Sequence, residues 1–165
     1  MRLLGYFLAL LLTALAPLSA DARDVVAFNG YPAGSIVIIT NARTLYFVTG
    51  AGQAIRYPVG VGRAGMAWRG QARIAEKRLR PAWGPPADIA IANPRLPYVI
   101  EGGSPRNPMG AAAMGLTRGN YAIHGTNDPR SIGHFVSHGC IRMYNEDVLD
   151  LYRRAPVGTP VFVLQ

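Results

Sequence analysis

The chain has 165 residues, which is enough for one domain with a sizeable core but not for several. Its single cysteine excludes a disulfide within the chain. The formal net charge is +8, with Lys77 the only lysine among 17 basic residues, and such a surface attracts polyanions such as nucleic acid, acidic membranes and carboxylate-bearing wall polymers.

The first 22 residues have the features of a secretory signal peptide. Arg2 supplies a positive start, and a largely apolar run follows over residues 3–15. Ala20-Asp21-Ala22 then fits the small-residue pattern of a cleavage site. The run is shorter than the roughly 20 apolar residues of a transmembrane anchor. We therefore predict a signal peptide over residues 1–22, cleaved after Ala22 with Ala20 as the alternative, and export to the periplasm or cell wall without a membrane span in the mature chain. Export makes nucleic acid the least plausible partner.

Strand patterns dominate the next part of the chain. After a short lead-in over residues 23–34, the segments 35–40 and 44–49 are rich in Ile, Val and Thr and are separated by a turn. Residues 54–61 alternate, which places Ile55, Tyr57, Val59 and Val61 on one face. This pattern predicts a β-meander with one buried face.

The segment 63–119 is rich in glycine and proline, which excludes long helices and central strands there. We expect a short strand near residues 72–76, one helical turn near residues 87–91, and otherwise long ordered loops. Loops of this kind on a rigid scaffold usually carry binding function.

The last third of the chain alternates short strands with one helix. We predict strands over residues 121–124, 137–143 and 160–164. Asn145 can cap a helix over residues 146–154, which has acidic residues in its first turn and arginines in its last. The whole pattern is that of a mainly β domain with one or two short helices.

The only cysteine lies close to every histidine of the chain. Cys140, His124, His134 and His138 all fall within residues 121–143. A free thiol has a pKa of about 8.5 and its thiolate is the reactive form, so a nucleophilic cysteine needs a base. A buried structural cysteine would need none, and Gly139 with its polar neighbours does not suit an apolar slot. The cluster therefore predicts cysteine acyl-transfer chemistry.

The same side chains could also be zinc ligands. Zinc peptidases, however, place two histidines at helical spacing beside a glutamate, as in H-E-x-x-H, and the glycines around these residues disfavour a helix. We therefore predict no metal. Acyl transfer through a cysteine conserves bond energy in a thioester, so no other cofactor is expected either.

A family resemblance rests on the same residues. His124-Gly125-Thr126, a loop, and Ser137-His138-Gly139-Cys140-Ile141-Arg142-Met143 resemble the signature of the L,D-transpeptidases (YkuD-type catalytic domain). Segments 80–86, 101–103, 107–111 and 145–152 resemble further parts of that family, so the resemblance covers about residues 34–165. It implies one catalytic domain over residues 35–165 with a β-sandwich-like fold of mixed sheets.

Cys140 is the predicted nucleophile, and the base has two candidates. On a strand, the side chain of His138 would share a face with Cys140, whereas the resemblance implies His124 as the base. The resemblance also implies that the carbonyl of Gly125 fixes the His124 tautomer. Asp128 is the alternative orienting group, although its loop position also suits an Asx turn.

The remaining residues of the motif have supporting roles in this prediction. Gly139 lets the substrate carbonyl approach the backbone, and its N–H and that of Cys140 form an oxyanion hole. Ser137 and His138 support the loop, with His138 lining the pocket, and His134 lies at the surface. Arg142 would share a strand face with Cys140, and it either clamps a substrate carboxylate or forms a structural ion pair.

The resemblance implies an exported enzyme whose substrates are the peptide stems of peptidoglycan. Cys140 would form a thioester with a tetrapeptide stem, release the terminal D-amino acid, and pass the acyl group to an amine. The amine would belong to a second stem, giving a 3→3 crosslink, or to a protein such as an outer-membrane protein or lipoprotein. An L,D-carboxypeptidase or endopeptidase, with water as acceptor, is the alternative. A non-catalytic wall-binding module is a third reading, but it would have no use for the His124–Cys140 pair.

Overall fold

The computed structural model describes residues 24–165, so the predicted signal peptide lies outside the described residues. Strands outnumber helices in the described chain, as predicted. In order the elements are β1 (Asp24–Ala27), β2 (Ile36–Ile39), β3 (Thr44–Gly50), β4 (Gln53–Pro58), β5 (Val61–Gly62), β6 (Gly70–Leu79), α1 (Ala87–Ala92), β7 (Ala112–Leu116), β8 (Ala122–His124), a 3-10 turn (Pro129–Ser131), β9 (Phe135–Ser137), β10 (Ile141–Arg142), α2 (Asn145–Arg154) and β11 (Pro160–Leu164).

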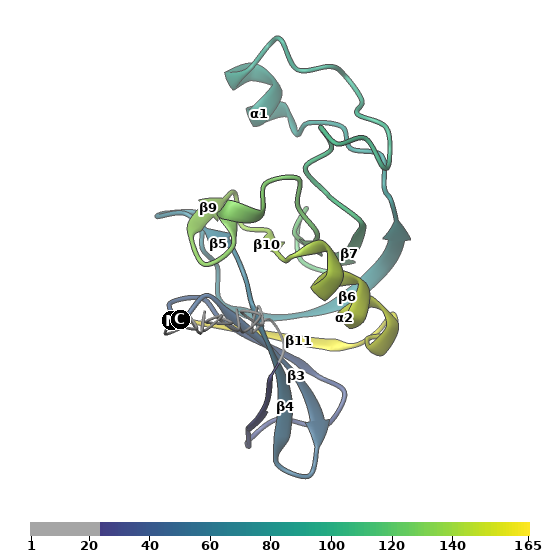
Figure 1. The fold of residues 1–165 in the computed structure, drawn as a ribbon. Coiled ribbons are helices and arrows are strands. Elements are labelled where there is room, and N and C mark those ends of the chain that lie inside the picture. Colours follow the sequence, from purple (N-terminus) through teal and green to yellow (C-terminus); the bar gives the residue numbers. More distant parts are fainter. Residues whose placement is uncertain (1–23) are drawn as a thin grey trace, which may run out of the picture.

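One long mixed sheet bends at β6. Its strand order is β1-β4-β3-β2-β11-β6-β7-β8-β10, and β5 pairs separately with β9. The first residues of β6 pair with β11, and those from Ile74 onward pair with β7, with an irregularity in this pairing between Ile74 and Glu76. An irregularity of this kind bends a strand and increases its twist, and Figure 1 shows β6 curving between the two halves of the sheet. The predicted sandwich-like fold of mixed sheets is therefore confirmed.

The core lies between the two halves of the sheet and α2. Alternating residues of the strands supply it, including Ile36 and Ile38 of β2 and Met114 of β7. From α2, Val148 and Leu151 are fully buried in the same cluster, and burying each of these side chains contributes about 1.5–3 kcal/mol. Within residues 24–165 no helix is long and apolar enough to cross a membrane.

Three predicted elements differ from the structure. The lead-in over residues 23–34 contains β1, which pairs antiparallel with β4. The strand expected near residues 72–76 is the ten-residue β6. The exclusion of central strands from residues 63–119 is wrong, because β6 and β7 lie in the interior of the sheet and neither contains a proline. Strand β7 was not expected, because its sequence of Ala, Met, Gly and Leu lacks the β-branched and aromatic residues that mark strands.

The strand predicted over residues 137–143 is wrong. The chain forms β9 and β10 instead, and these pair with different strands, β5 and β8. Gly139, between them, has a φ of +117°, a backbone conformation that an extended strand does not contain. Cys140 therefore lies in a turn that leads into β10.

The predicted role of Asn145 as helix cap is also wrong. Helix α2 begins at Asn145 itself, and the preceding residue, Tyr144, forms no side-chain capping hydrogen bond. The acidic residues of the first turn and the arginines of the last turn are where the sequence predicted them. The side chain of Asn145 is used elsewhere, as described below.

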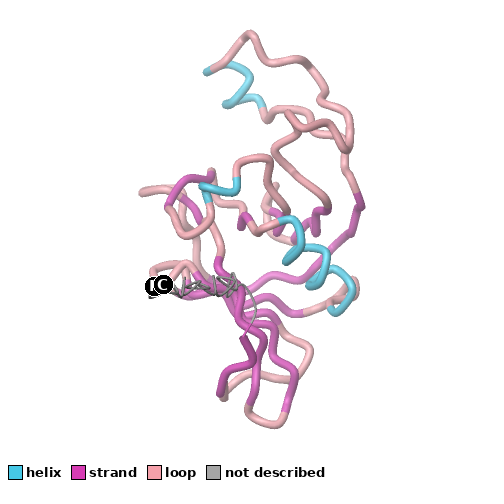
Figure 2. The backbone as a smooth tube through the Cα atoms, viewed as in Figure 1, coloured by secondary structure: helices cyan, strands magenta, loops and turns pink. Residues whose placement is uncertain are grey.

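Residues 80–111 form an arm that leaves β6, carries α1 and returns to β7 (Figure 2). The side-chain amide of Asn107 closes its base, because its two N–H groups are shared among the carbonyls of Pro81, Ile100 and Glu101, which lie 2.8, 3.1 and 3.1 Å from Nδ2. Trp83 and Ile100 exchange backbone hydrogen bonds across the arm. The arm is thus an ordered loop structure with one helical turn, as the sequence predicted.

Candidate active site

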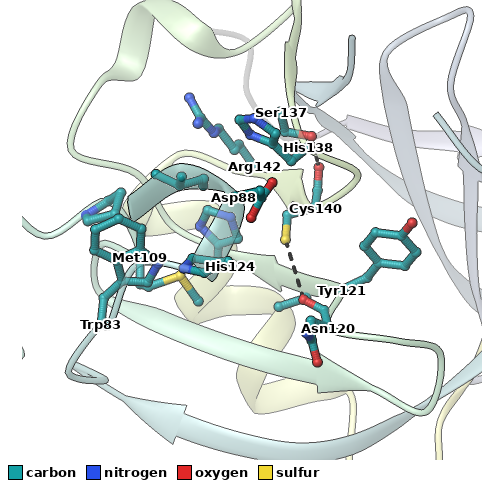
Figure 3. A pocket seen from close by; sticks show the side chains of 15 residues that line it. Trp83, Asp88, Met109, Asn120, Tyr121, His124, Ser137, His138, Cys140 and Arg142 are labelled. Carbon is teal, nitrogen blue, oxygen red and sulfur yellow. Dashed lines mark hydrogen bonds between the residues drawn. The ribbon is translucent and has the colours of Figure 1, made fainter. Parts of the chain in front are cut away.

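A cavity of about 550 Å³ lies between the arm and the strands β8 and β10. It brings together five of the predicted site residues, namely His124, Ser137, His138, Cys140 and Arg142. The arm adds Trp83, Asp88 and Met109, and the turn before β8 adds Asn120 and Tyr121 (Figure 3). These added residues were not predicted individually; the resemblance of segments 80–86 and 107–111 to the family was a signal for Trp83 and Met109, and not for Asp88, Asn120 or Tyr121.

Strand alternation explains why the reactive groups face this cavity. Strands β8 and β10 run parallel, with His124 paired to Arg142 and Ile123 paired to Ile141. Ile123 and Ile141 are buried in the core. Because successive side chains of a strand point to opposite faces, His124 and Arg142 point to the other face, where the cavity lies.

Hydrogen bonds hold the Cys140 turn in place. Ser137 Oγ donates to the carbonyl of Cys140 at 2.6 Å and accepts from the Gly139 N–H at 3.1 Å. The indole nitrogen of Trp68 donates to the carbonyl of Gly139 at 3.0 Å. Trp68 in turn stacks on Tyr121, with ring centroids 5.2 Å apart. Ser137 thus makes two of the hydrogen bonds within the Cys140 turn.

The Gly139 N–H is not available as an oxyanion donor in this conformation. It donates to Ser137 Oγ, so the predicted pair of donors is reduced to the N–H of Cys140. The physical reason is that Ser137 Oγ lies 3.1 Å from this nitrogen and accepts its hydrogen bond.

His124 is buried and neutral. Its Nδ1 lies 2.6 Å from the carbonyl oxygen of Gly125, and because a carbonyl only accepts, Nδ1 carries the proton and Nε2 has the free lone pair. Burial is the main reason that the pKa of His124 falls to about 4; the Arg142 charge lowers it further, while the Gly125 and Pro108 carbonyls raise it. The imidazole is therefore unprotonated at neutral pH.

The Cys140 thiol is protonated at rest. Burial raises its pKa, whereas the backbone N–H of Ala122 and the charge of Arg142 lower it. Its Sγ lies 4.0 Å from the carbonyl oxygen of Asn120 (Figure 3). Among the described residues, no hydrogen bond joins Sγ to His124. Such contacts commonly tighten only when substrate is bound.

The Nε2 nitrogen of His138 takes part in a hydrogen bond. Nη2 of Arg63 lies 2.9 Å from Nε2 of His138, and a guanidinium can only donate, so this bond occupies the Nε2 lone pair. The reasoning that put His138 and Cys140 on one strand face also fails, since the two are separated by the turn at Gly139. Both findings favour His124 as the base. His134 is exposed, as predicted.

Asp128 does not contact His124. Its carboxylate pairs with the Arg130 side chain at 3.3 Å, and its carbonyl accepts from Ser131 Oγ at 2.6 Å. Asp128 is thus a loop residue, and the orienting group of His124 in this structure is the Gly125 carbonyl.

Arg142 brings positive charge to the cavity. Its Nε is buried and has no hydrogen-bond partner among residues 24–165, and no ion pair involves it within that range. The structural ion pair that the sequence left open is therefore absent there. Asp88, on α1, lines the same cavity. In the described part of the chain no group of three or more His, Cys, Asp or Glu side chains could hold a metal ion.

The sequence profile of the L,D-transpeptidase catalytic domain, YkuD, matches residues 33–163. The chain belongs to this family. The probable L,D-transpeptidase YbiS of Escherichia coli is 38% identical over 136 residues, which are 78% of this chain and 43% of YbiS. The chain thus spans less than half the length of this relative.

Solved structures agree on the fold. An L,D-transpeptidase of Mycobacterium tuberculosis with a faropenem-derived adduct has a TM-score of 0.60 at 20% identity, over 79% of this chain and 60% of its own. A protein of Brucella melitensis, named as a probable carnitine operon oxidoreductase, is 41% identical with a TM-score of 0.59, over 86% of this chain and 92% of its own. That name describes the Brucella protein; the family of the present chain follows from the YkuD match and from YbiS.

Proposed function

We propose that this L,D-transpeptidase-family chain is an exported cysteine acyltransferase that acts on peptidoglycan stems, with Cys140 as nucleophile and His124 as base. The observation that supports this most strongly is the cavity that holds Cys140 beside a neutral His124. The Gly125 carbonyl holds the His124 proton on Nδ1, which leaves Nε2 to accept the thiol proton.

The acylation step follows from these positions. Cys140 Sγ attacks the carbonyl of the L-centre in a tetrapeptide stem, and its proton moves to His124 Nε2. The tetrahedral oxyanion accepts a hydrogen bond from the Cys140 N–H. When the intermediate collapses, the C–N bond breaks and His124 returns the proton to the departing D-amino acid. The product is a thioester on Cys140.

The second step transfers the acyl group to an amine. The amine attacks the thioester, His124 accepts its proton, and the thiolate leaves and is reprotonated. Because one peptide bond is broken and one amide bond is formed, with the acyl group held as a thioester in between, the exchange needs no nucleotide and no cofactor. Arg142 forms no ion pair within residues 24–165, and in this proposal it binds a carboxylate of the stem.

The test is to incubate the mature protein with tetrapeptide muropeptides and to identify the products by mass. Crosslinked dimers are expected, together with a transient mass increase on Cys140. Trimmed tripeptides without dimers would indicate the hydrolase instead. If neither crosslinked dimers nor trimmed tripeptides form, the result contradicts an enzymatic function and favours the wall-binding alternative.

Two variants separate the candidate bases. His124→Ala should slow acylation of Cys140 by about 10²- to 10⁴-fold, the usual contribution of a positioned base. His138→Ala should affect acylation less, because Arg63 already occupies its Nε2. The reverse order of effects would make His138 the base. Cys140→Ser, which should stay folded, controls for uncatalysed reaction.

A further inference from the structure

Asn145 joins three segments of the chain through one side chain. Its Oδ1 accepts from the backbone N–H of Ala111 at 2.9 Å and from that of Thr126 at 3.2 Å, and its Nδ2 donates to the carbonyl of Thr126 at 3.0 Å. Ala111 ends the arm, Thr126 follows the His124 strand, and Asn145 begins α2. The side chain therefore connects the arm, the strand of the candidate base and the helix behind them.

One of these bonds reaches the peptide group that orients His124. The Thr126 N–H belongs to the same peptide unit as the Gly125 carbonyl, and that carbonyl accepts from His124 Nδ1 at 2.6 Å. Because a peptide unit is planar, holding its N–H against Asn145 Oδ1 also sets the direction of its C=O. Hydrogen bonds arranged in series polarise one another, so the amide of Asn145 also strengthens the bond to Nδ1.

The local sequence leaves space for this contact. A Cβ added to Gly125 or to Gly110 would overlap Asn145 Oδ1. The absence of a Cβ at Gly125 and Gly110 thus lets the amide of Asn145 approach both the Gly125–Thr126 peptide and the end of the arm. A residue that served only to start a helix would need neither opening, and α2 has no side-chain cap of that kind.

We propose that Asn145 is a positioning residue for His124, which acts through the Gly125–Thr126 peptide to keep the imidazole proton on Nδ1 and Nε2 toward the cavity. This inference rests on the proposed function in one respect, since it matters for turnover only if His124 is the base. The orientation of the ring itself can be measured on the resting protein.

The first measurement is the tautomer of His124, read from the ¹⁵N shifts of the histidine rings in the full mature chain. The wild type and Glu146→Ala should show His124 as the Nδ1–H tautomer, because Glu146 is the exposed next residue of α2 and forms no part of the relay. Asn145→Ala should shift His124 toward a mixture of tautomers. Asn145→Asp keeps an acceptor for both N–H groups and should retain the Nδ1–H form.

The second measurement is the acylation of Cys140 for the same variants. Asn145→Ala should lower kcat by about 10- to 100-fold, the usual effect of a slightly misplaced reacting group, with KM changed less than about threefold. Asn145→Asp should recover most of this loss, and Glu146→Ala should match the wild type. If Asn145→Ala does not fold, Asn145→Ser, whose hydroxyl is too short for these contacts, replaces it.

The outcomes separate the two proposals. An unchanged Nδ1–H tautomer in the Asn145 variant would overturn the positioning role, whatever its activity. A shifted tautomer with unchanged acylation would leave the positioning role intact and contradict His124 as the base. A lower melting temperature with neither effect would make Asn145 a purely structural tie and would also overturn the inference.

Discussion

Gly139 carries two constraints at one residue, a positive φ of +117° and close contact with a neighbouring ring. A Cβ at this position would overlap Cε1 of Tyr121. Tyr121 is itself held by its stacking on Trp68, so moving its ring away from an added Cβ would cost free energy. The residue before the candidate nucleophile is therefore glycine for a packing reason as well as a backbone one.

We predict that Gly139→Ala destabilises the fold and displaces Cys140. Backbone strain of this kind costs about 1–3 kcal/mol, and the overlap with Tyr121 adds to it. Gly133→Ala is the matched control, because Gly133 also has a positive φ, of +82°, but no atom lies within 4 Å of an added Cβ. Thermal unfolding and the alkylation rate of Cys140 measure the two effects. Equal losses in both variants would show that the Tyr121 contact is unimportant.

The buried His124 makes the stability of the protein depend on pH. Its pKa is about 4 in the folded state against an ordinary value of 6.5. Between these values the unfolded chain binds a proton that the folded chain does not, so stability falls as the pH decreases through this range. Above about pH 7 the histidine is neutral in both states and contributes no pH dependence.

We expect this group to remove about 3 kcal/mol of the unfolding free energy as the pH falls from about 7 to 4. Denaturant unfolding at several pH values should therefore show a steeper decline for the wild type than for His124→Gln. His134→Gln, at an exposed histidine, should keep the wild-type slope. If His124→Gln declines as steeply as the wild type, His124 is not buried in its neutral form.

At the scale of elements, the arm over residues 80–111 decides the shape of the cavity. It supplies Trp83, Asp88 and Met109 to the lining, and it is tied to the rest of the fold at its base by Asn107. Asn107 is almost completely buried, and its Oδ1 also accepts from the Met109 N–H at 2.9 Å. One side chain thus holds both the base of the arm and a lining residue.

We predict that Asn107→Ala loosens the arm and weakens substrate binding more than chemistry. Removing one amide leaves buried carbonyls with fewer donors, at a cost of about 1–3 kcal/mol. Hydrogen exchange at the Trp83 and Ile100 amides should become faster, and KM should rise by about tenfold with kcat nearly unchanged. Asn127→Ala is the control, since its Nδ2 makes only a long 3.4 Å contact with the Pro105 carbonyl. A fall in kcat alone would place the effect at Cys140 rather than in the arm.

At the scale of the whole molecule, the bend in β6 brings distant segments to one site. The two ends of β6 pair with β11 and β7, so the chain before β6 and the chain after β8 meet around Cys140. Arg63 reaches His138 and Trp68 reaches Gly139 in this way, over separations of 75 and 71 residues. The site is therefore a property of the bent sheet and not of the motif segment alone.

Export is a prediction about the whole chain. If residues 1–22 are a signal peptide, protein from the native host should begin near Arg23 and lie outside the cytoplasm. N-terminal sequencing of that protein checks the start, and fractionation checks the location. Recovery of an intact Met1 from a membrane fraction would identify the segment as an anchor.

The sequence by itself determined the family, the mainly β fold and the identity of five residues that meet in the cavity, namely His124, Ser137, His138, Cys140 and Arg142. These features depend on local patterns, namely alternating apolar and polar residues in strands, proline-rich loops and the short spacing around Cys140. Such patterns can be recognised from the order of residues alone. The preference for His124 over His138 came from the resemblance, because two nearby histidines look alike in a linear pattern.

The tertiary structure alone decided how those residues are used. The predicted strand is interrupted at Gly139. The Gly139 N–H donates to Ser137 Oγ, and Arg63 occupies Nε2 of His138. The side chain of Asn145 also contacts the peptide beside His124 instead of serving as the expected helix cap. The physical reason is common to these cases: each depends on a hydrogen bond or contact whose partner is set by how strands pair and where a turn points, and local residue preferences do not encode that choice.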